Sequence, residues 1–181
     1  MIKDLIKFLN SRNSGFTLIE LLIVIGIITL LSTMAIFYSH TGERQIILFQ
    51  EQVKILNAIS RAKSLSINTF NQQDVPCGFG VHFDSSNGSF IIFKELATKI
   101  DCSNVDFQYS GESEDFEVFN LNSFIVFDSL TLDDIIFFPP EPIIAILPDF
   151  QEEATIGLKI IGSTEPIVII KVNKFGMITT Q

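Results

Sequence analysis

The stretch SGFTLIELLIVIGIITLLSTMAI, residues 14–36, decides how the rest of the chain is placed. Between residues 16 and 37 the only formal charge is Glu20. At about 1.5 Å of rise per residue this segment forms roughly 33 Å of helix, close to the thickness of a bilayer core. An ionisable side chain inside such a segment is costly and usually functional, so Glu20 requires an explanation.

The residues that flank this segment favour export of the larger part of the chain. Lys3, Lys7 and Arg12 precede it, which favours a cytoplasmic N-terminus. A secretory signal peptide would end at a small-residue cleavage site, and the residues FYSHTGE at 37–43 contain none. A plain signal anchor explains the length and the orientation but gives Glu20 no role.

A third interpretation comes from a resemblance. RNSGFTLIELLIVIGIITLL, residues 12–31, resembles the class III leader and N-methylation motif of type IV pilins and of type II secretion pseudopilins. The resemblance implies that a prepilin peptidase cuts between Gly15 and Phe16 and methylates the new Phe16 amine. It also implies that Glu20 is an assembly carboxylate that pairs with the amine of a neighbouring subunit, and a buried carboxylate is tolerated when it is partnered. The alternative is a glutamate that merely reaches towards the lipid headgroups.

The chain beyond the apolar segment continues as a helix and then changes character. Residues 39–73 contain no proline, and apolar side chains recur at helical spacing, so we expect one helix from about Phe16 to Phe70. Residues 71–74 and Pro76 end it. The predicted divisions are a leader (1–15), a membrane or filament-core helix (16–38), its amphipathic continuation (39–73) and an exported β-rich domain (74–181).

The amphipathic half of the predicted helix has two faces. The predicted inward residues are Leu48, Phe49, Val53, Ile55, Leu56, Ile59 and Ala62. The predicted outward residues are Glu51, Lys54, Asn57, Arg61 and Ser64.

Short runs of Phe, Ile and Val separated by turn residues fill the remainder and predict strands without intervening helices. The predicted strands are 78–83, 89–94, 105–110, 116–121, 123–128, 134–138, 143–147, 154–161, 166–172 and 176–180. Turns are expected at residues 84–88 and 173–176, and a proline loop at 139–142. The fold class is therefore α+β, with a long N-terminal helix packed on a mainly antiparallel sheet or sandwich.

The β-rich part also carries a resemblance. ISRAKSLSINTFNQQDVPCGFGVHF (59–83) and IVIIKVNKFGMITT (167–180) are similar to the GspH/FimT group of minor pseudopilins and minor pilins. In that group a long helix is followed by an all-β domain.

Cys77 and Cys102 are the two cysteines of the chain. A disulfide is favoured if this part lies outside the cytoplasm, and two unpaired buried thiols are the alternative. A metal site is disfavoured because Cys77 has no CxxC partner and histidines are scarce.

The sequence offers no catalytic constellation and no cofactor motif, so we expect a protein that is not an enzyme and binds no cofactor. His82 alternates within a predicted strand and is interpreted as a surface or satisfied residue. The acidic residues Glu112, Glu114, Asp115 and Glu117 predict a solvated loop, with calcium binding as a less favoured alternative.

Charge argues against nucleic acid as a partner. The chain has a formal net charge of −9, and removal of residues 1–15 would leave nine basic and twenty acidic residues, or −11. No arginine follows Arg61, so a basic stripe is missing.

The sequence thus predicts a minor pilin or pseudopilin, a non-enzymatic subunit of a filament of the type IV pilus or type II secretion kind. Its expected partners are the prepilin peptidase, other subunits, the inner-membrane assembly platform and the membrane itself. Its expected location is the cytoplasmic membrane, with the C-terminal domain exported, and then the filament. The rival hypothesis is a membrane-anchored β-domain that binds a ligand or partner without entering a filament.

Overall fold

A computed structural model describes residues 16–69, 76–96, 102, 105–139, 143–163 and 167–181. The predicted leader with Gly15, the helix-ending residues 71–74 and residues 140–142 of the proline loop lie outside this part of the chain. The chain forms two units, Met1–Gly42 and Glu43–Gln181.

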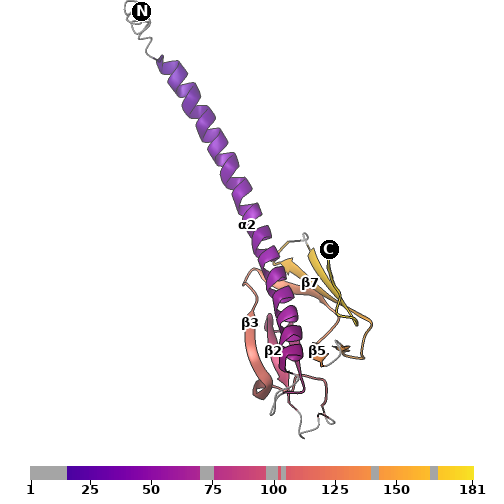
Figure 1. Ribbon diagram of the computed structural model, residues 1–181. Helices are drawn as coiled ribbons and strands as arrows, with labels where there is room; N and C mark the ends of the chain where they lie inside the picture. Colours follow the sequence, from indigo (N-terminus) through magenta and orange to yellow (C-terminus); the bar gives the residue numbers. More distant parts are fainter. Residues whose placement is uncertain (1–15, 70–75, 97–101, 103–104, 140–142, 164–166) are drawn as a thin grey trace, which may run out of the picture. The chain divides into compact units, whose positions relative to one another are not determined.

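The long helix is confirmed. Helix α2 runs from Leu18 to Thr69, within two residues of the predicted start and one of the predicted end (Figure 1). Its residues from Glu43 onward belong to the second unit and contribute one wall of that unit's core.

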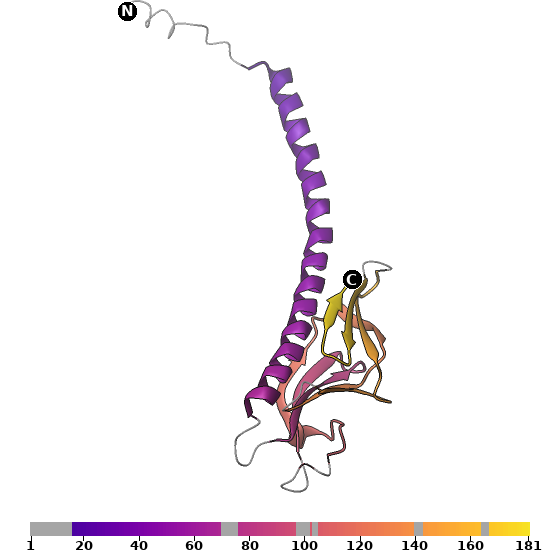
Figure 2. The same ribbon diagram turned by 45° about the vertical axis from the view of Figure 1, so that its right-hand side comes forward.

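Two antiparallel sheets make up the rest of the second unit (Figures 1 and 2). The first, sheet A, has the strand order β3-β2-β1-β5-β6, and the second, sheet B, has the order β4-β7-β8-β9. The strands of sheet A are β1 (Gly78–Asp84), β2 (Ser89–Glu95), β3 (Asp115–Asn120), β5 (Asp134–Phe138) and β6 (Ile143–Leu147). Those of sheet B are β4 (Ile125–Leu130), β7 (Glu153–Ile160), β8 (Ile167–Asn173) and β9 (Ile178–Thr180).

The two predicted hairpin turns form as expected. In the turn between β1 and β2, Asp84 Oδ1 accepts hydrogen bonds from the backbone N–H groups of Ser86 and Asn87. Gly88 ends this turn at a φ of 61°, a conformation that a glycine adopts without steric cost. Between β8 and β9, Asn173 Oδ1 accepts from the N–H groups two and four residues further on. Local side-chain chemistry therefore fixes both connections.

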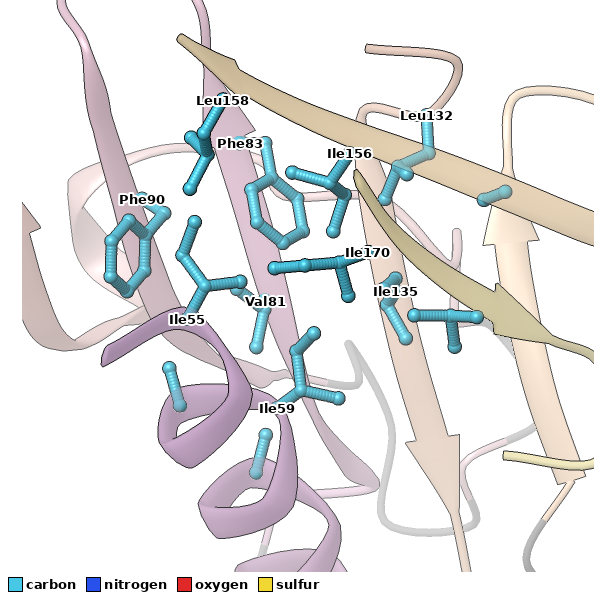
Figure 3. Packing of buried hydrophobic residues seen from close by; sticks show 14 of the residues in the cluster. Ile55, Ile59, Val81, Phe83, Phe90, Leu132, Ile135, Ile156, Leu158 and Ile170 are labelled. Carbon is cyan, nitrogen blue, oxygen red and sulfur yellow. The ribbon is translucent and has the colours of Figure 1, made fainter. Parts of the chain in front are cut away.

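The main core lies where α2, sheet A and sheet B meet. Figure 3 shows Ile55 and Ile59 of α2 against Val81 and Phe83 of β1, with Ile170 of sheet B closing the cluster. All five side chains are buried. Burial of this much branched and aromatic surface against one half of the helix stabilises the α+β architecture that the sequence predicts.

The predicted inward face of α2 is only partly right. Phe49 and Val53 were expected inside, yet they are 55% and 51% exposed, while Glu51 was expected outside and is only 5% exposed. The buried stripe is centred on Leu48, and at about 100° per residue Phe49 and Val53 lie roughly 100° and 140° away from it. Glu51 lies at the edge of the stripe, where Lys54 Nζ pairs with its carboxylate at 2.7 Å.

The predicted strand at 105–110 is wrong. This segment alternates between half-buried and exposed side chains but joins neither sheet. Phe107 adopts a positive φ of 62°, and Asp106 Oδ1 accepts the Gln108 N–H in a tight local turn, so the backbone cannot extend. Instead, Tyr109 packs against Phe93 and Phe107 against Phe138, over the outer face of sheet A.

Candidate functional site

The first turn of α2 contains the lone carboxylate of the apolar segment. Thr17 precedes the helix, and its hydroxyl oxygen accepts the backbone N–H of Glu20 at 3.2 Å. Its carbonyl accepts the N–H of Leu21 at 3.1 Å, which opens the helical hydrogen-bond ladder. Thr-x-x-Glu is the spacing of a capping box, so the sequence itself specifies where this helix starts. A carboxylate in the first turn is also favoured by the helix dipole.

The helix that follows presents apolar side chains on every side. Residues Leu18–Ile36 form a helix long and apolar enough to cross a membrane, and none of it is buried within the described chain. The hydroxyls of Thr29 and Thr33 donate to the carbonyls of Gly26 and Leu30, so these two polar groups are satisfied inside the helix. A surface of this kind needs lipid or other apolar helices around it.

Phe16, the predicted new N-terminal residue, lies just ahead of this helix and is exposed. Glu20 is likewise exposed and four residues further along. Its predicted partner, the amine of another subunit, would therefore find the carboxylate accessible.

The structure joins Cys77 and Cys102 in a disulfide, with the Cα atoms 5.6 Å apart. The bond ties the residue before β1 to the segment that follows β2. Cys77 also donates its backbone N–H to the carbonyl of Glu95 at 2.9 Å, so the disulfide lies at the end of the β1–β2 pair.

The acidic stretch is not the solvated loop that the sequence predicts. Glu114 is only 4% exposed, and its carboxylate accepts the N–H of Ser110 at 2.7 Å. Asp115 accepts the hydroxyl of Tyr109 at 2.6 Å. Burial, and then this hydrogen bond to Asp115, raise the pKa of Tyr109 to about 12. These carboxylates organise the polypeptide around them, which sequence spacing alone did not indicate.

Glu95 was missed at the sequence level. It ends β2 and is 1% exposed. Burial and then the charges of Glu114 and Asp106 raise its pKa to about 8. The available signal was strand alternation, because Glu95 continues the row of Ile91 and Phe93 on a face that turned out to be covered.

His82 is satisfied, as the sequence interpretation expected. Its Nδ1 lies 2.8 Å from Asp134 Oδ1, on the directly paired residue of β5. Its ring stacks on Tyr109 with centroids 4.5 Å apart. Within the described residues, no three His, Cys, Asp or Glu side chains gather in a way that could hold a metal ion.

Several cationic side chains of the second unit lie beside carboxylates. Lys171 lies 3.4 Å from Glu153 across the β7–β8 pair, and Lys159 pairs with Asp128. Exposed ion pairs of this kind add little stability. Their carboxylates do, however, neutralise positive charge that would otherwise attract the phosphates of a nucleic acid.

Comparison with known proteins identifies the N-terminal segment. Residues 10–36 match the family described as the prokaryotic N-terminal methylation motif. This is the N-terminus typical of type IV pilins and pseudopilins. No curated protein and no solved structure matches the chain significantly.

Proposed function

We propose that this chain is a minor pilin or pseudopilin, a non-enzymatic subunit of a filament built by a type IV pilus or type II secretion machine. The observation that carries the proposal is the methylation motif at residues 10–36, placed directly on a helix whose apolar surface is wholly exposed. The second unit has a core of its own, so the apolar helix is free to serve assembly.

The proposed route begins in the cytoplasmic membrane. The apolar helix inserts, the prepilin peptidase cuts between Gly15 and Phe16, and the new Phe16 amine is methylated. The assembly platform then moves the subunit into a bundle, where the exposed apolar helices bury one another. Glu20 offsets the cationic amine of a neighbour, which lowers the cost of holding either charge in an apolar setting.

Processing is tested by intact mass spectrometry of the chain expressed with a prepilin peptidase. The expected product begins at Phe16, one methyl group heavier, and two hydrogens lighter for the Cys77–Cys102 bond. Full-length protein that keeps residues 1–15 despite an active peptidase contradicts the proposal and leaves a membrane-anchored β-domain as the remaining interpretation.

Assembly is tested separately at Glu20. Glu20→Ala and Glu20→Gln should both be processed and should both fail to enter filaments. Gln retains the hydrogen-bonding capacity of a capping box but lacks the charge. Glu20→Gln therefore separates the role of Glu20 in capping the helix from its role in pairing with a charged amine. Thr17→Ala is the matched control, since it removes the helix cap and leaves the carboxylate. Filaments that form with Glu20→Gln but not with Thr17→Ala show that Glu20 acts in capping rather than in charge pairing.

A further inference from the structure

The outer face of sheet A, the face turned away from the main core, carries a second apolar cluster. Phe93 of β2, Ile136 of β5 and Ala145 of β6 are buried there. Residues 105–111, called here the cover segment, close over them without joining the sheet. Phe107 and Tyr109 are the cover's half-buried side chains in this cluster.

The end of the cover segment is fastened by a buried carboxylate. Glu114, in the short 3₁₀ helix η1 (Glu112–Glu114), accepts the N–H of Ser110 at 2.7 Å and that of Leu96 at 3.5 Å. One side chain thus joins the cover segment to the residue after β2. In both contacts the carboxylate of Glu114 is the acceptor.

Glu95 precedes Leu96, whose N–H donates to Glu114. The surroundings of the Glu95 carboxyl disfavour its ionised form. It is 1% exposed, and its Oε2 has no hydrogen-bond partner within the described chain. A buried, unpaired carboxylate oxygen is expensive when charged and much less so when protonated.

The charged side chains that act on Glu95 are all acidic. The charges of Glu114 from η1 and Asp106 from the cover segment oppose its ionisation, and a weaker opposite effect comes from a hydrogen bond with the Asp106 backbone N–H. Glu112 and Asp115 add negative charge around Tyr109. From β1 the residue paired with Glu95 is the uncharged Gly78. Of these carboxylates, Asp106 belongs to the cover segment itself, and Glu114 holds the end of that segment through the Ser110 N–H.

We propose that Glu95 is a proton-operated latch for the cover segment. When its carboxyl is neutral, Glu114 and Asp106 can approach and residues 105–111 close over the outer face of sheet A. When it is ionised, three carboxylates face one another, the cover segment opens and the apolar cluster around Phe93 becomes accessible.

The direction of the pH dependence follows from linkage. The pKa of Glu95 is about 8 in the closed form, against an ordinary value of 4.5 once the segment opens and the group is solvated. Between pH 4.5 and about 8, Glu95 is therefore protonated in the closed form and ionised in the open form. Because opening then releases a proton, the population of the open form rises roughly tenfold per pH unit across this range. Above about pH 8 both forms are ionised and the population levels off.

Hydrogen exchange of the full-length chain in detergent micelles tests the latch. Protection factors are compared between pH 5.5 and 7.5, which removes the intrinsic pH dependence of exchange. The peptide that contains the Ser110 amide should lose protection about 100-fold over these two units, while β7 and β8 keep theirs. Glu95→Gln, which cannot ionise, should show a constant protection factor at Ser110.

Asp106→Asn is the second variant, chosen because Asp106 is exposed and Asn keeps an acceptor for the Gln108 N–H. Removing this charge should move the levelling-off to lower pH. A wild-type protection factor at Ser110 that is constant with pH overturns the proposal, even if Glu95→Gln does not fold. The same slope in Glu95→Gln, or an equal loss in β7 and β8, overturns it as well.

Discussion

The position of α2 on the two sheets can be tested by a pair of substitutions two residues apart. Ile55 is fully buried in the cluster between α2 and both sheets, whereas Val53 is half exposed on the same helix. Sequence periodicity assigned both to the inner face, so the pair distinguishes the observed face of the helix from the predicted one. The substitutions are Ile55→Ala and Val53→Ala.

The loss in the free energy of unfolding that each substitution causes can be estimated from the burial of its side chain. Ile55→Ala removes three carbon atoms at about 0.8 kcal/mol each, and the residual cavity adds to that, so we expect a loss of roughly 3 kcal/mol in the free energy of unfolding. Val53→Ala removes two carbons that are already half hydrated, worth about 0.8 kcal/mol. Alanine is also the better helix former by a few tenths of a kcal/mol, so Val53→Ala should remain within about 0.5 kcal/mol of wild type.

The measurement is urea unfolding of the full-length chain in micelles. The chain has no tryptophan, so the transition is followed by far-ultraviolet circular dichroism. With an m-value near 2 kcal/mol per molar, Ile55→Ala should lower the midpoint by about 1.5 M at unchanged slope.

Equal costs at the two positions would refute the reasoning, because they would mean that the helix face is rotated from the one described. A small cost at Ile55 would mean that the cluster collapses around the substitution or that the helix is not packed there. A changed m-value would remove the two-state basis of the comparison and direct attention to the denatured state.

Three further outcomes follow from particular contacts. Replacing both Cys77 and Cys102 by Ser removes a link across 25 residues of chain, and urea midpoints should report a loss of about 3.5 kcal/mol. Gly80→Ala would place a Cβ 2.6 Å from ring atoms of Phe93, so the same assay should show about 1–3 kcal/mol of destabilisation, and a neutral result would contradict the close approach. The hydrogen bond from the neighbouring Ser86 hydroxyl, and then those from Asn87, lower the pKa of Asp84 to about 2. The stability it contributes is present above its ordinary 3.8 and is lost as pH falls through about 2. Urea midpoints taken between pH 4 and 2 should therefore fall less in Asp84→Asn than in wild type.

Structural features that depend on residues close together in the chain could be predicted from the sequence. Thr17 and Glu20 stand at the spacing that caps a helix, and the unbroken apolar run after them sets its length. The hairpin at residues 84–88 could be predicted because Asp84 and Gly88 supply the turn's hydrogen bonds and its positive φ. In each case the residues that decide the structure lie within a few positions of one another.

The segment at 105–110 shows where local reading fails. Its alternation of apolar and polar residues is the pattern of a strand, yet it arises because Phe107 and Tyr109 face a sheet surface from outside. The period of apolar residues indicates which side chains are buried. It does not indicate whether the backbone of the segment pairs with a neighbouring strand. The turn at Asp106 and the positive φ of Phe107 depend on where the cover segment meets sheet A.

The sequence by itself determined the long capped helix, its apolar first half with one carboxylate, the antiparallel β-rich remainder and most of the strand boundaries. Only the tertiary structure decided the strand order of the two sheets, the face of α2 that is buried, and the burial of Glu51, Glu114 and Glu95. The physical reason is that helix capping, turn formation and strand alternation are set by neighbours in the chain. The burial of a carboxylate and the choice of a helix face are set by surfaces that other elements of the fold contribute, and no short stretch of sequence encodes their arrangement.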